Sequence, residues 1–112
     1  MDELIGEFTL KNDYTIYRTK EGYKSVSKKK TQEYVQHIPD EVYESAKIQL
    51  SGREWSVGEA AERLEVIAKS DNWPFYYGHK LKFFSQAILL AIVANGEGDF
   101  DKESHSFIYT VF

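Results

Sequence analysis

Hydrophobic and polar residues alternate along the N-terminal third of the chain. Over residues 6–10 the apolar and polar side chains occupy opposite sets of alternate positions, which is typical of a strand with one face in water. Residues 14–19 and 23–27 are rich in aromatic and β-branched types and flank a short turn, so they predict a hairpin. An extended segment over residues 33–38, ending before Pro39, completes a predicted meander.

The middle of the chain has helical periodicity. Apolar residues recur at intervals of three and four over residues 40–50, which predicts a first helix that begins at two acidic residues. A second helix is predicted over residues 56–69, because Ser56 and Glu59 have the spacing of a capping box. Residues 79–94 are apolar nearly all round, as expected of a third helix that is surrounded by protein.

These elements together indicate an α+β protein. We expect an acidic loop over residues 97–103 and a last strand over residues 106–112. The predicted order is β-β-β-(β)-α-α-α-β, an antiparallel sheet of three to five strands packed on about three helices. The N-terminal meander and the C-terminal strand would share this sheet, with the third helix against it. The length of 112 residues predicts a single globular domain, 1–112.

The composition narrows the classes of protein to which the chain can belong. Hydrophobic residues make up 42% of the chain and aromatic residues 15%, which favours a packed core over intrinsic disorder. The absence of cysteine excludes disulfides, thiolate zinc sites and cysteine nucleophiles. The N-terminus lacks the basic start and long apolar stretch of a secretory signal, so we expect a cytoplasmic protein with no membrane association.

Charge is unevenly distributed and leads to one hypothesis for function. The net charge of −4 argues against general affinity for the nucleic-acid backbone, although basic residues are concentrated toward the N-terminus. A sheet surface there could bind nucleic acid, with aromatic rings stacking on bases and lysines contacting phosphates. The candidate residues for this surface are Tyr17, Lys20, Tyr23, Lys24, Lys28, Lys29 and Lys30. The alternative is structural, because lysines protect strand edges and tyrosines are common strand residues.

A second route to nucleic-acid binding involves the predicted helix over residues 56–69. Residues 55–64 resemble the first helix of a helix-turn-helix, in which a small residue such as Ala61 allows close packing of the next helix. The pattern then departs from that motif, because Glu65 stands where a glycine is expected. Residues 70–74 also do not suit a recognition helix. An amphipathic core helix is the alternative interpretation.

An aromatic connector before the third helix suggests a protein-binding site. Tyrosine and tryptophan concentrate binding energy at protein interfaces, so an exposed connector would bind a protein partner or another copy of the chain. Its candidate residues are Trp73, Phe75, Tyr76, Tyr77 and His79. The same residue types are typical of a loop that closes over its own core. His79 with Tyr76, Tyr77 and Lys80 is also a hypothetical acid–base cluster at a helix start.

No motif for a cofactor, metal or nucleophile is present in the sequence. The three histidines, His37, His79 and His105, lack the spacings that place two ligands on one face, so we predict no metal site and no cofactor. The sequence therefore favours a small protein-interaction, oligomerising or regulatory module without intrinsic catalysis. The alternative is a nucleic-acid-binding regulator.

Overall fold

Two sheets and three helices make up the fold of the computed structural model, which describes residues 2–73, 78–101 and 108–112. Strands β1 to β4 form one antiparallel sheet and strands β5, β7 and β6 form another. The elements in chain order are β1 Glu3–Thr9, β2 Asp13–Arg18, β3 Gly22–Lys29, β4 Gln32–Pro39, α1 Asp40–Leu50, β5 Arg53–Trp55, α2 Val57–Ser70, α3 Gly78–Ala94, β6 Gly98–Asp101 and β7 Ile108–Val111.

The four-stranded sheet is a meander in the order β1-β2-β3-β4. A two-residue turn joins β3 to β4, and Lys30 in that turn has a φ of 57°. At the other end of the sheet Gly22 lies so close to the backbone of Ile38 that a β-carbon there would collide with the Ile38 carbonyl oxygen. All four strands of the meander were predicted, with shifts of a few residues at their ends.

The helices follow the periodicity of the sequence. The first helix spans Asp40–Leu50, as predicted, with its acidic residues in the first turn. The capping box of α2 is confirmed, because the Ser56 hydroxyl accepts from the Glu59 amide and the Glu59 carboxylate accepts from the Ser56 amide. These two bonds satisfy amides that have no partner inside the helix.

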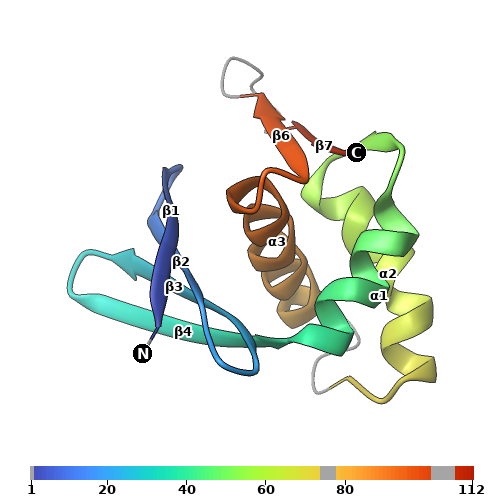
Figure 1. Ribbon diagram of the computed structural model, residues 1–112, viewed down its shortest axis with the longest axis horizontal. Helices are drawn as coiled ribbons and strands as arrows, with labels where there is room; N and C mark the ends of the chain where they lie inside the picture. The colour runs from blue at the N-terminus through green and yellow to red at the C-terminus, as the bar shows by residue number, and fades with distance from the viewer. Residues whose placement is uncertain (1, 74–77, 102–107) are drawn as a thin grey trace.

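Helix α3 occupies the centre of the fold (Figure 1). It lies between the four-stranded sheet on one side and helices α1 and α2 on the other, and it contacts every strand of that sheet. Its side chains from Ala87 to Ile92 are all buried. This burial explains why its sequence has no polar face. The predicted central position of the third helix is therefore confirmed.

The α+β class is confirmed, but the C-terminal strand does not join the meander. Strand β7 pairs with β5 on one side and with β6 on the other, forming a separate sheet. The expected acidic loop is in part strand β6, in which Asp99 and Asp101 face water and Phe100 packs against Tyr109. Strand β6 follows α3 after a tight turn and is the strand that precedes β7 in the chain. Strands that are consecutive in the chain usually pair, so β7 pairs with β6 instead of with the meander. In the described ranges, no helix is long and apolar enough to cross a bilayer.

Candidate interaction surface

The four-stranded sheet has one covered face and one open face. Residues directly opposite each other in the register share a face, and faces alternate along each strand. The covered face packs against α3 and buries Tyr14, Ile16, Tyr23 and Ile38. Figure 1 shows the helices and the second sheet on that side only. The open face is therefore the surface on which the sheet meets solvent.

We call this open side the outer face. It consists of Leu4, Glu7, Thr9, Asp13, Thr15, Tyr17, Lys24, Val26, Lys28, Glu33, Val35 and His37. None of these side chains is buried. Leu4 and Val35 are the most exposed apolar side chains of the outer face, with exposed fractions of 51% and 48%. Val26, directly opposite Val35 on β3, extends the apolar area toward the middle of the sheet.

The lysines of the outer face are paired with acidic side chains. The Lys24 ammonium donates to the Asp2 carboxylate at 2.8 Å and lies 4.7 Å from the centre of the Tyr17 ring. The hydrogen bond with Asp2 raises the pKa of Lys24 and lowers the pKa of Asp2. Lys28 forms an ion pair with Glu33 at 3.7 Å. The outer face thus combines exposed apolar residues with charges of both signs.

The other residues of the basic-aromatic hypothesis lie elsewhere. Tyr23 has only 8% of its surface exposed and lies on the covered face, where its ring packs 4.5 Å from that of Tyr43. Lys20 follows β2 at one end of the sheet, whereas Lys29 and Lys30 lie at the turn between β3 and β4 at the opposite end. Strands of this length separate the two ends by roughly 20 Å. Only Tyr17, Lys24 and Lys28 therefore share a face.

The aromatic connector is described only at its first residue. Trp73 has 4% of its surface exposed and packs edge to face on Phe84, with ring centres 5.9 Å apart. Trp73 therefore belongs to the core of its own chain, as expected under the alternative in which the connector is a loop that closes over that core. Phe75, Tyr76 and Tyr77 lie outside the described residues, as does the side chain of His79. The hypothetical acid–base cluster falls on the same segment, of which only Lys80 is described, as exposed.

The segment that resembles a helix-turn-helix forms α2, an amphipathic helix with one buried face. Ala60, Ala61, Leu64 and Ala68 are buried, and α2 packs against α3. The next helix along the chain is α3, which is enclosed by protein over most of its described length. A recognition helix has to present its side chains to the groove of DNA. Helix α3 does not offer such a surface.

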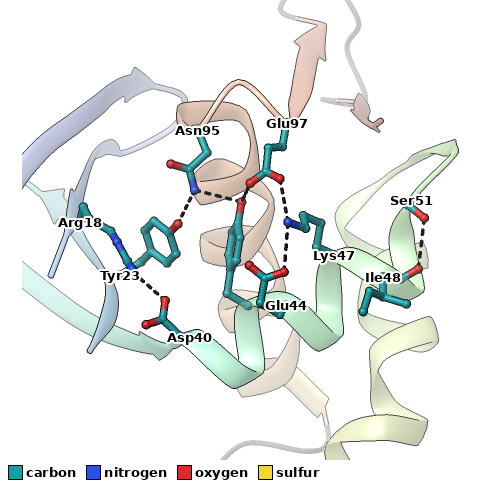
Figure 2. A network of polar contacts seen from close by, with 10 residues as sticks. Arg18, Tyr23, Asp40, Glu44, Lys47, Ile48, Ser51, Asn95 and Glu97 are labelled. Carbon is teal, nitrogen blue, oxygen red and sulfur yellow. Dashed lines mark hydrogen bonds and ion pairs between the residues drawn. The ribbon is translucent and has the colours of Figure 1, made fainter. Parts of the chain in front are cut away.

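A polar network joins the sheet to α1 and to the end of α3 (Figure 2). On the sheet side, the Arg18 guanidinium donates to Asp40 at 2.7 Å. Asn95 donates from one amide nitrogen to the hydroxyls of Tyr23, at 2.6 Å, and Tyr43, at 3.0 Å. Because these contacts link residues far apart in the chain, they fix the sheet at a set position relative to the helices.

The carboxylate of Glu97 completes this network. It accepts from the Tyr43 hydroxyl at 2.6 Å and from Lys47 at 2.7 Å, and Lys47 also pairs with Glu44 at 3.1 Å. Burial, together with the bond to Glu97, raises the pKa of Tyr43, while Lys47 and Tyr43 lower the pKa of Glu97. These polar groups are satisfied by one another, which suits a structural role more than ligand binding.

The two edges of the four-stranded sheet differ. Strand β1 carries a bulge, seen as a shift of register between Leu4 and Gly6. Strand β4 pairs with β3 without interruption over eight residues, and no strand in the described part of the chain pairs with its other side. Residues 32–35 and His37 are all exposed, whichever face they occupy. Strand β4 is therefore accessible to solvent along most of its length, although the Tyr34 ring lies edge to face on Phe83 of α3.

The sequence interpretation did not find the outer face or the β4 edge. The alternation of residues 6–10 indicated one face in water, but the partners of each strand were needed to place residues on a common face. Leu4 and Val35 lie 31 positions apart, and neither belongs to a motif. A weak signal was present in Glu33, Val35 and His37, which alternate along the predicted last strand of the meander.

Comparison of the chain with models of protein families, with curated proteins and with solved structures finds no match. The described residues also contain no group of three or more histidine, aspartate or glutamate side chains placed to hold a metal ion. The fold and the surface define an α+β protein with one open sheet face, and function is argued from that face.

Proposed function

We propose that this chain is a protein-binding module and that the outer face of the four-stranded sheet is its binding surface. The observation that supports the proposal most strongly is a sheet face that no other described element covers and that exposes Leu4 and Val35 among charged side chains. Leu4 on β1 and Val35 on β4 belong to opposite edge strands, and the partly exposed Tyr17 and Val26 lie on the strands between them. A surface that mixes apolar, aromatic and charged side chains in this way is typical of protein interfaces. The aromatic connector, with Trp73 in the core, contributes less to the proposal.

The charges of the outer face favour a protein partner over nucleic acid. Lys24 is held by Asp2 and Lys28 by Glu33, so neither is available to a phosphate without the loss of an ion pair. Glu7 and Asp13 add negative charge to the same face. A partner that carries both acidic and basic side chains would match this pattern, whereas a polyphosphate would be repelled by it.

The proposal is tested by substitution on the face with a matched control. Leu4→Lys places a charge at an exposed apolar position of the outer face, and Ile48→Lys places the same charge on α1, where Ile48 has 70% of its surface exposed. We expect the first variant to lose proteins that the wild type retains from an extract, and the second to retain them. Binding is then measured with the purified partner. Equal retention by both variants would overturn the proposal.

A titration with single-stranded oligonucleotides at two salt concentrations separates the two classes of partner. A complex held by phosphate contacts weakens steeply as salt rises. We expect no such complex at either concentration. A salt-sensitive complex that is lost with Lys24→Ala and Lys28→Ala would favour the nucleic-acid alternative.

A further inference from the structure

Strand β4 is an edge strand, and on the side away from β3 its main-chain N–H and C=O groups are not paired with another strand of the described chain. The amide of Asp40 donates to the carbonyl of Glu21 at 3.0 Å, which places Asp40 in the set of residues that bond across to β3. Bonded residues alternate along an antiparallel pair. Glu33, Val35 and His37 belong to the other set, so their N–H and C=O groups are directed away from β3.

Proline in the same strand agrees with this assignment. Pro39 is two positions after His37 and therefore belongs to the outward set. Proline is found in sheets where its missing N–H would face solvent. The position of Pro39 thus indicates independently that the odd-numbered residues of β4 direct their amides outward, and it also marks where the row of donors ends.

Between Gln32 and Ile38, strand β4 has little of the usual protection of an exposed edge, and Pro39 blocks it only at its end. Natural edges are blunted by bulges, lysines or prolines within the strand. The opposite edge of this sheet has a bulge in β1 between Leu4 and Gly6, whereas residues 32–38 contain no bulge, lysine or proline. An edge of this kind pairs readily with another strand.

The sequence of the edge is complementary to itself. When two antiparallel β4 strands are centred on Val35, Val35 lies opposite Val35 of the second copy and Glu33 lies opposite His37 of the second copy. The outward groups of these residues then form about six main-chain hydrogen bonds. Registers centred on position 33 or 37 place Glu33 against Glu33 or His37 against His37. Of these three registers, the one centred on Val35 avoids both like-with-like contacts and pairs Glu33 with His37 of the second copy.

We propose that the chain forms a two-fold homodimer through its β4 edges, paired antiparallel about Val35. This inference rests on the proposed function, because both treat the four-stranded sheet as the part of the chain that binds partners. At the β4 edge the partner is a second copy of the chain. The apolar row from Val26 to Val35 then continues across the interface into the same row of the second copy. An extended peptide from another protein is the competing occupant of this edge.

The backbone part of the proposal is tested with Val35→Pro. This variant removes one outward donor in each copy and leaves the bonds between β3 and β4 in place, as Pro39 already does at its own position. Sedimentation equilibrium should show a dimer for the wild type and a weakening of association by at least about tenfold for the variant. Circular dichroism should show that the fold is retained, and Ile48→Lys, on α1, should remain dimeric.

The side-chain part of the proposal is tested with a charge exchange. His37→Glu places Glu opposite Lys24 within its own chain, which favours the hairpin, and opposite Glu33 of the second copy, which opposes the dimer. We expect dissociation with a fold at least as stable as the wild type. Glu33→Lys combined with His37→Glu should restore the dimer by pairing opposite charges again. Lys28→Glu is added to this variant so that position 33 keeps an opposite charge across from it in its own hairpin.

Failure of the dimer and failure of the proposed function have different signatures. A wild type that is monomeric at all concentrations, or a dimer unaffected by Val35→Pro and His37→Glu, overturns the homodimer. A monomer that still loses its protein partner with Leu4→Lys would leave the proposed function standing. Binding of an extended peptide to that monomer, lost with Val35→Pro, would assign the edge to the competing occupant.

Discussion

Tyr43 and Glu97 lie 54 positions apart in the chain and share a hydrogen bond of 2.6 Å. Tyr43 comes from α1, and Glu97 lies in the turn between α3 and β6. The bond joins α1, which continues from the four-stranded sheet, to the turn that leads into strand β6 of the second sheet. The relative position of the two sheets therefore depends on this contact and on the groups that surround it.

Loss of the Tyr43 hydroxyl should destabilise the fold. Tyr43→Phe keeps the buried ring but removes a donor to Glu97 and an acceptor for Asn95. We expect the free energy of unfolding in urea to fall by about 1–2 kcal/mol. Tyr34→Phe is the control, because its hydroxyl bonds to Gln32 on the exposed strand β4, and it should change the free energy by less than about 0.5 kcal/mol. Equal effects would contradict the structural role of the network.

Stability should depend on pH through Glu97. Lys47 and Tyr43 lower the pKa of Glu97 in the folded protein below its ordinary value of 4.5. A carboxylate whose pKa is lowered by folding adds stability above its unfolded pKa and loses it as pH falls through the folded pKa. Glu97→Gln should therefore be less stable than the wild type near pH 7, and the difference should shrink as pH falls below 4.5. Urea denaturation at several pH values measures this difference in the free energy of unfolding. A difference that stays constant with pH would contradict the prediction.

Gly22 should not tolerate a side chain. A β-carbon at this position would meet the Ile38 carbonyl oxygen and, at 2.9 Å, the Asp40 amide nitrogen. Gly22→Ala should lower the free energy of unfolding by more than about 2 kcal/mol, because backbone must move where β4 enters α1. Gly58→Ala is the matched control, since a β-carbon there meets nothing within 4 Å and alanine favours helix. The control should be neutral or stabilising in thermal unfolding.

The cap of α2 should contribute measurably to stability. Ser56→Ala removes the hydroxyl that accepts from the Glu59 amide at 3.2 Å. Loss of such a cap costs about 1 kcal/mol. Ser51→Ala serves as the comparison, because its hydroxyl makes one exposed bond of 3.3 Å to the Ile48 carbonyl. Chemical denaturation should show a clear shift of the midpoint for the first variant only, and a shift of equal size for both would argue against the cap.

The elements with long periodic patterns were predictable from sequence alone. Helix α1 and the capping box at Ser56 were found because their signals lie within a few neighbouring residues. Strand β5 was missed, since three residues are too few to establish a period. Strand β6 was mistaken for a loop because its alternating Asp99 and Asp101 suggested a solvated acidic segment.

The candidate surface was predictable only in fragments. Tyr17 and Lys24 were correctly placed on predicted strands, whereas Lys28 was placed just after a strand that in fact includes it. The sequence could not show that Tyr23 faces the core while Tyr17 faces water on the neighbouring strand. That distinction depends on the register between β2 and β3. Val35 and Leu4 drew no attention for the same reason, because exposure of an apolar residue is decided by what packs on it.

The bulge near Gly6 has a consequence for how large an assembly can become. A sheet with two regular rims can recruit copies at both sides and elongate without limit, as fibrils do. Here the β1 side is interrupted by the bulge, and pairing of two β4 strands leaves no free β4 side for a further copy. The joined sheet would then end in an irregular rim on each side, so growth would stop at two chains and the protein would stay dispersed at high concentration.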